Sequence, residues 1–141
     1  SINLIKKLNK ARNLQEENIF PFNHSDDVSP YSNVARIIDI NNVKKFDITI
    51  LSLWDDGHLA GHFSNSIETK DPRFCITNDS PKPPKIRISF NINWLINSSK
   101  LILSVIGSKK SLALQDLIDG NGLHSRLWNL DNLILITDRD I

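Results

Sequence analysis

The chain has 141 residues, a formal net charge of +1, 40% hydrophobic and 23% charged residues, a balance typical of ordinary globular proteins. This length suits one domain, which we expect to span residues 1–141, and the small charge disfavours a nucleic-acid or membrane surface. The single cysteine excludes an internal disulfide and disfavours a structural zinc site. Because no membrane-length apolar stretch or signal-peptide pattern is visible, we expect a cytoplasmic location.

The hydrophobic pattern predicts alternating helices and strands. Apolar residues at helical spacing predict helices over residues 2–13, 31–40 and 109–119, and residues 91–98 are expected to form a short helix or a turn. Apolar runs rich in β-branched residues predict strands over residues 46–53, 86–90, 100–106 and 133–137. Residues 55–85 are rich in Gly, Asn, Ser, Asp and Pro and are expected to form a long loop, with a brief apolar piece at residues 74–77. Such alternation predicts an α/β fold of three layers, a mostly parallel sheet with helices on both faces.

Asp56-Gly57-His58 come directly after the strand predicted over residues 46–53. In open α/β sheets, ligands bind at the carboxyl ends of the strands. Gly57 permits a sharp turn, Asp56 would fix the tautomer of the imidazole, and His58 would take a proton from water or substrate. Taken alone, these three residues fit a polar turn with a solvated histidine more often than a functional site.

Gly107-Ser108-Lys109-Lys110 form a second candidate, between a predicted buried strand and the helix over residues 109–119. Backbone N–H groups at the start of a helix and a lysine ammonium together suit a phosphate group. The glycine spacing of a P-loop is missing. An ordinary helix start with exposed lysines fits the segment equally well.

Three prolines make residues 80–87 rigid and extended. The segment would present Lys82 or Arg87 to an anion, or it would serve as a stiff linker into the strand over residues 86–90.

The remaining histidines and the cysteine favour structural roles. His58 and His62 have a helical metal-ligand spacing, but two glycines disfavour a helix there and no third ligand is evident. We expect His24 and His124 at the surface and Cys75 in the core.

Taken in order, three segments resemble the carboxyl-terminal part of the 6-phosphogluconolactonase family, which belongs with the glucosamine-6-phosphate isomerase/deaminases in one superfamily. Residues 46–63 end in Asp-Asp-Gly-His-Leu-Ala-Gly-His-Phe and are similar to the family's strand and "DGHTASLF" loop. Residues 80–89 resemble its "SPKPPxRIT" segment, and residues 105–114 resemble its "VTGxxKAxAL" segment. The resemblance implies a Rossmann-like domain in an incomplete version.

The resemblance also implies hydrolysis of 6-phosphogluconolactone to 6-phosphogluconate, in the oxidative pentose phosphate pathway, without a metal or cofactor. His58 would be the general base and Asp56 would orient it. Lys110 would hold the phosphate. Further substrate contacts are implied for Gly57, Arg87, Gly107 and Ser108. The expected partner is thus a small sugar phosphate, with no nucleic acid and no membrane.

The chain departs from the family pattern beside the candidate base. Ser52 and Trp54 replace two glycines, and Leu59 and Gly61 replace a threonine and a serine. The family's amino-terminal glycine-rich loop and "DER" motif have no counterpart in this sequence. Without the strands that accompany them, the sheet would have an open edge, which would favour a homodimer or a further amino-terminal segment that covers the edge. The alternatives are a sugar-phosphate-binding or scaffold protein without catalysis, and a glucosamine-6-phosphate deaminase, which the proline-rich segment disfavours.

Overall fold

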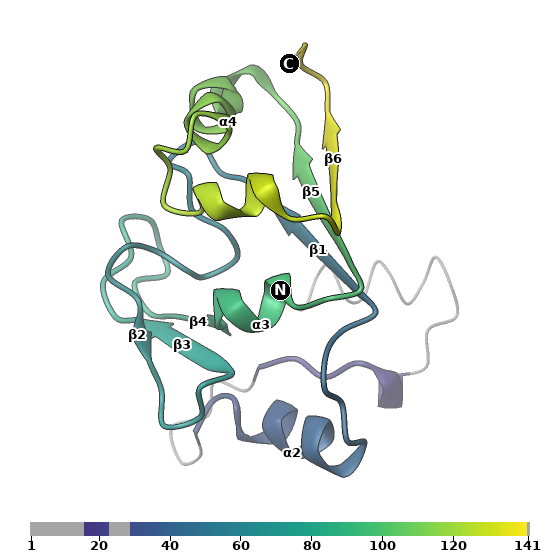
Figure 1. Ribbon diagram of the computed structural model, residues 1–141. Helices are drawn as coiled ribbons and strands as arrows, with labels where there is room; N and C mark the ends of the chain where they lie inside the picture. Colours follow the sequence, from purple (N-terminus) through teal and green to yellow (C-terminus); the bar gives the residue numbers. More distant parts are fainter. Residues whose placement is uncertain (1–15, 23–28, 141) are drawn as a thin grey trace. The chain divides into compact units, whose positions relative to one another are not determined.

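Figure 1 shows the computed structural model of the chain, which describes residues 16–22 and 29–140. The chain divides into two compact units, residues 1–42 and residues 43–141. The helix predicted over residues 2–13 and His24 lie outside the described residues. That residues 1–141 form one domain stays a prediction.

The first unit contains the short 3-10 helix η1 (Glu16–Asn18) and the helix α2 (Ser32–Ile40). α2 confirms the helix predicted over residues 31–40. Val34 and Ile38 are its buried residues, and because they are four residues apart they lie on one face of the helix. Asn41 follows the last turn, and its side-chain amide donates to the carbonyl of Ile37 at 2.9 Å.

A parallel sheet organises the second unit and confirms three of the predicted strands. β5 (Lys100–Val105) lies between β1 (Ile48–Ser52) and β6 (Leu133–Thr137) and is parallel to both (Figure 1). In this register Leu103 is the partner of both Leu51 and Leu135. β5 is buried at Leu101, Leu103 and Val105, as its central position and apolar run require.

A second sheet, which is antiparallel, contains β2 (Ile67–Glu68), β3 (Phe74–Thr77) and β4 (Arg87–Phe90) in that order. The strand predicted over residues 86–90 is present, but its expected place in the parallel sheet is wrong. Its partner β3 lies within the stretch expected to be a long loop. The connection over residues 78–86 contains no helix and is shorter than the roughly dozen residues that a parallel crossover needs, so β4 returns antiparallel.

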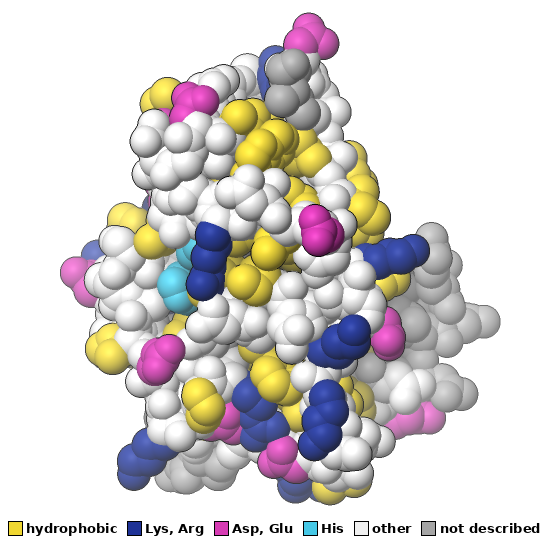
Figure 2. Space-filling model, in the orientation of Figure 1, with side chains coloured by type: hydrophobic (Ala, Val, Ile, Leu, Met, Phe, Trp, Pro, Cys, Tyr) yellow, Lys and Arg dark blue, Asp and Glu magenta, His cyan; other side chains and the backbone are white. Residues whose placement is uncertain are grey.

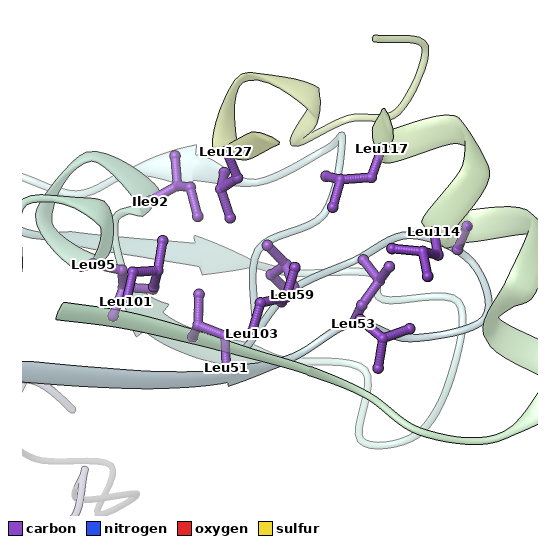
Figure 3. Packing of buried hydrophobic residues seen from close by; sticks show 12 residues of the cluster. Leu51, Leu53, Leu59, Ile92, Leu95, Leu101, Leu103, Leu114, Leu117 and Leu127 are labelled. Carbon is purple, nitrogen blue, oxygen red and sulfur yellow. The ribbon is translucent and has the colours of Figure 1, made fainter. Parts of the chain in front are cut away.

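The hydrophobic core of the second unit joins the parallel sheet to α3 (Ile92–Ile96), α4 (Ser111–Ile118) and the 3-10 helix η3 (Ser125–Asn129). α3 shows that residues 91–98 contain a short helix, and α4 confirms the helix predicted over residues 109–119. Figure 3 shows leucines of the strands facing those of the helices. Leu53 and Leu59 belong to this core and are 1% and 0% exposed. They flank the Asp-Gly-His segment, which is thus fixed to the core at both ends.

The opposite face of the parallel sheet is apolar and exposed. Ile50 is 70% exposed, Ile134 is 44% exposed, and Ile102 pairs with both in the register between them. Figure 2 shows hydrophobic side chains reaching the surface in the region of β5 and β6. The helices of residues 43–140 pack on the buried face, so these residues do not form the second helix layer of the predicted architecture.

Candidate active site

His58 and Asp56 form an oriented pair in the loop that follows β1. The imidazole Nδ1 lies 2.5 Å from the Asp56 carboxylate, and the His58 backbone N–H also donates to that carboxylate at 3.4 Å. Partial burial would raise the pKa of Asp56, but the hydrogen bonds from His58 outweigh it, and the pKa lies below the ordinary 3.8. A carboxylate only accepts hydrogen bonds, so Nδ1 carries a proton, and in the neutral imidazole Nε2 then holds the lone pair of a base.

The backbone of this loop closes tightly on itself. The N–H of Trp54 donates to the carbonyl of His58 at 3.2 Å, and the N–H of Gly57 donates to the carbonyl of Trp54 at 3.0 Å. Gly57 has φ 79°, a conformation that side-chain-bearing residues rarely adopt. The sharp turn inferred from the glycine is therefore confirmed, and it places the carboxylate of Asp56 against the imidazole.

Two aromatic rings cover the His58 imidazole, which is 4% exposed. The indole of Trp54 stacks on it at 5.4 Å and 12°, and the ring of Phe63 stacks on it at 4.1 Å and 22°. This burial contradicts the solvated histidine of the polar-turn interpretation.

The antiparallel sheet holds Phe63 in place through a chain of hydrogen bonds. The N–H of Phe63 donates to the hydroxyl of Ser66 at 2.8 Å, which lies 2.6 Å from the hydroxyl of Thr77 in β3. Thr77 in turn donates to the carbonyl of Gly61 at 3.0 Å. Because Thr77 uses its hydrogen on Gly61, Ser66 donates to Thr77. The sheet that the sequence did not predict thus positions one of the two rings against His58.

Lys110 and Lys82 bring two ammonium groups to the same indole. The Nζ atoms lie 5.8 and 5.7 Å from the Trp54 ring centroid. Lys110 donates to the hydroxyl of Ser52 at 2.9 Å, at the end of β1. Lys82 pairs with Asp55 at 2.5 Å, and this hydrogen bond raises the pKa of the lysine. The structure therefore brings the predicted phosphate-binding lysine beside the loop of the candidate base.

Gly107 begins the segment that carries Lys110, with φ 103°. Its N–H donates to the carboxylate of Asp138, 3.1 and 3.2 Å from the two oxygens. Ser108 begins the 3-10 helix η2 (Ser108–Lys110), which leads into α4. The N–H of Gly107 thus already binds an anionic group, and that group belongs to the chain itself.

Arg87 braces the proline-rich loop. Its guanidinium donates to three backbone carbonyls, those of Lys82 at 3.2 Å, Pro83 at 2.9 Å and Pro84 at 2.9 Å. These bonds support the loop that carries Lys82 to the indole. The predicted contact of Arg87 with a substrate anion stays a prediction.

The expected surface position of His124 is wrong, because this histidine is 2% exposed. Its Nε2 lies 3.4 Å from the carbonyl of His62, and the two rings are 5.1 Å apart. His124 also lines a cavity of about 300 Å³ together with Asp56 and Gly57. Histidine is compatible with core and surface alike, so the sequence carries no signal for this burial. Cys75, expected in the core, is buried.

The described part of the chain shows neither a cluster of metal ligands nor a membrane-spanning helix. No three His, Cys, Asp or Glu side chains within it come together in an arrangement that could hold a metal ion. No helix within residues 16–22 and 29–140 has the length and hydropathy that a membrane crossing requires.

A parallel sheet with an oriented histidine and a lysine at its carboxyl edge defines an α/β protein whose polar side chains gather where ligands bind in open α/β sheets. The sequence profile of the family "Glucosamine-6-phosphate isomerases/6-phosphogluconolactonase" matches residues 3–127, and the chain belongs to this family. The family expected from the three sequence segments is thereby confirmed.

Relatives in plants are similar to part of this chain. "Probable 6-phosphogluconolactonase 2" of Oryza sativa subsp. indica is 37% identical over 90 residues, which are 60% of this chain and 32% of the relative. "6-phosphogluconolactonase 3, chloroplastic" of Arabidopsis thaliana is 30% identical over 93 residues, 64% of this chain and 29% of the relative. The chain thus spans about a third of the length of these relatives.

Solved structures share the fold. The 6-phosphogluconolactonase from Plasmodium vivax has a TM-score of 0.70 and 17% identity, over 96% of this chain and 61% of that one. The enzyme from Trypanosoma cruzi has a TM-score of 0.58 and 24% identity, over 66% and 38%. These matches confirm the α/β fold class, and the coverage of the matched chains fits an incomplete version of the domain.

Proposed function

We propose that this chain provides the general base of a 6-phosphogluconolactonase, which hydrolyses 6-phospho-D-glucono-1,5-lactone to 6-phosphogluconate in the oxidative pentose phosphate pathway. The observation that carries the proposal is the Asp56–His58 pair, in which Nδ1 is bound to a carboxylate and Nε2 is left as the base. The family of the chain and the names of its plant relatives support the choice of substrate.

The chemistry needs one base and modest stabilisation of charge, because a lactone is an activated ester. Nε2 of His58 takes a proton from water, and the water oxygen bonds to the lactone carbonyl carbon. The resulting oxyanion collapses, the bond from that carbon to the ring oxygen breaks, and the ring oxygen takes the proton back from His58. Asp56 stabilises the imidazolium that exists between the two proton transfers. No metal or cofactor takes part in this scheme.

Lys110 is the proposed phosphate-binding residue, because its ammonium lies at the loop of the candidate base. Gly57, Ser108, Gly107 and Arg87 remain proposed substrate contacts. For the last two the support is weaker, since the N–H of Gly107 and the guanidinium of Arg87 already bind groups of the chain.

One observation favours a binding protein without catalysis as the second candidate. His58 is 4% exposed and lies under the indole of Trp54, where the family pattern has a glycine. In this second candidate, the chain binds a sugar phosphate and does not turn it over.

Lactone hydrolysis at neutral pH separates the two candidates. We expect the chain to exceed the spontaneous rate and the His58→Ala variant to lose about 10²- to 10⁴-fold, the usual contribution of a general base. Retained binding of 6-phosphogluconate with no rate above the spontaneous one would establish the second candidate in place of the first.

The phosphate assignment has its own test. Lys110→Ala is expected to weaken binding of 6-phosphogluconate about tenfold, because a charged hydrogen bond is lost. Lys109→Ala is the matched control, since the neighbouring lysine is exposed. Equal affinities of the two variants would refute the assignment.

One face of the parallel sheet is apolar and exposed. We propose that this face is covered in the functional protein. A second copy of the chain or an amino-terminal segment preceding Ser1 would bury Ile48, Ile50, Ile134 and Ile136. Sedimentation of the chain against concentration distinguishes self-association from a monomer. The single domain over residues 1–141 and the cytoplasmic location stay part of this proposal.

A further inference from the structure

The exposed indole of Trp54 lies beside the candidate base, where the quoted family pattern has glycine. One ring contact is with the imidazole of His58, yet the residue is 47% exposed. It follows the fully buried Leu53 but does not share its place in the core. Packing of the core therefore does not account for a tryptophan at this position.

Two ammonium groups meet this indole. Lys110 reaches it from η2 and Lys82 from the proline-rich loop, with Nζ atoms 5.8 and 5.7 Å from the ring centroid. Both distances lie within the roughly 6 Å over which a cation is attracted to the face of an aromatic ring. The indole therefore has an ammonium group from each of two segments within reach, beside the imidazole on which it stacks.

The present partners of these lysines compete weakly with a dianion. Lys110 donates to the neutral hydroxyl of Ser52. Lys82 pairs with Asp55, where both side chains are 44% exposed, and its Nζ also lies 4.0 Å from the carboxylate of Asp56, which is 32% exposed. An ion pair this exposed contributes only about 0–1 kcal/mol. A phosphate group, with two charges and several acceptor oxygens, can take the place of Asp55 on Lys82.

We propose that Trp54 is a positioning residue that holds Lys82 and Lys110 as a two-ammonium clamp for the phosphate of the ligand. Asp55 is the counter-ion of Lys82 when the clamp is empty. The inference rests on the proposed function for the class of ligand, a phosphorylated sugar acid or its lactone. It adds a second lysine to the phosphate site and gives Trp54 the role of positioning both ammonium groups, which select the phosphorylated form.

Calorimetric binding of 6-phosphogluconate and of gluconate to the 141-residue chain tests the clamp. Lys82→Gln is expected to lower the affinity for 6-phosphogluconate about tenfold and to leave gluconate unaffected. Trp54→Leu is expected to lower the affinity for 6-phosphogluconate about fivefold. Trp54→Phe keeps an aromatic face and is expected to retain most of the wild-type affinity. Asp55→Asn is expected to raise the affinity for 6-phosphogluconate about threefold, and misfolding cannot produce such a gain.

Lys85→Gln is the matched control for Lys82→Gln. Lys85 lies in the same loop, pairs with Asp79 at 2.8 Å, and its side chain is 64% exposed. Its variant should bind like the wild type. Equal affinities of the Lys82 and Lys85 variants, wild-type binding by Trp54→Leu, or a wild-type chain that binds both ligands alike would each overturn the clamp. None of these measurements needs turnover, so a failure of hydrolysis alone counts against the proposed function and leaves the clamp standing.

Discussion

Acid should destabilise the chain through His124, a buried histidine that is neutral in the folded state. Burial lowers its pKa to about 4, and the electrostatic effects of His62, Arg126 and His58 act in the same direction. The carbonyl of His62, 3.4 Å from Nε2, opposes them. A protonated His124 would therefore be a buried cation beside other cationic groups, with one long hydrogen bond to stabilise it.

The size of the effect follows from the two pKa values. The unfolded chain binds the proton near the ordinary pKa of 6.5, whereas the folded chain binds it near 4. The contribution to stability is therefore fully present above about pH 6.5 and is lost as the pH falls towards 4. For one such group, the free energy of unfolding falls by about 1.2 kcal/mol between about pH 7 and pH 5.5. Aspartates and glutamates stay largely ionised over this range, so histidines dominate the change.

Urea unfolding at these two pH values measures the loss directly. In His124→Leu, a substitution of similar volume that cannot titrate, the loss should shrink by about 1 kcal/mol. His62 contributes in the same direction, because burial and the charge of Arg126 lower its pKa too. A variant that loses as much stability as the wild type between the two pH values would refute the assignment of the acid sensitivity to His124.

Two further substitutions test the core and the start of the phosphate segment. Leu103→Ala, at a fully buried position of β5, should lower the free energy of unfolding by about 3 kcal/mol, while Leu112→Ala, 73% exposed on α4, should change it by less than about 0.5 kcal/mol. Gly107→Ala should cost about 1–3 kcal/mol because φ is 103°, and Gly122→Ala, with ordinary contacts and no positive φ, should cost less. Urea unfolding measures all four, and equal midpoints within either pair would contradict the argument.

The parallel sheet could be predicted because its strands are short apolar runs rich in β-branched residues. The antiparallel sheet could not, since a period of two identifies a strand and not its partner. β4 alternates cleanly, but β3 supplies only four residues inside a polar stretch. The short connection over residues 78–86, which contains no helix, is what makes β4 pair antiparallel with β3.

The Asp56–His58 pair was accessible from the sequence because both side chains lie on one short loop, and a glycine between them fixes its turn. Contacts that join distant segments were not accessible. His62 meets His124, and Lys82 meets Trp54, only because the antiparallel sheet and the core place their loops side by side. The sequence contains these residues, but no local pattern pairs them.

Burial separates the two parts of the candidate site. The imidazole of His58 is held by a carboxylate and two stacked rings at 4% exposure, so its geometry depends on the core and on β3. The ammonium of Lys82 is attached by an exposed ion pair and can change partners cheaply. A buried imidazole beside exposed cations that can change partners suits the proposed function, in which the lysines bind the phosphate and the lactone carbonyl lies at Nε2. A test of lactone hydrolysis therefore probes the proposed base, whereas a test of 6-phosphogluconate binding probes the proposed clamp, and the two kinds of measurement can fail independently.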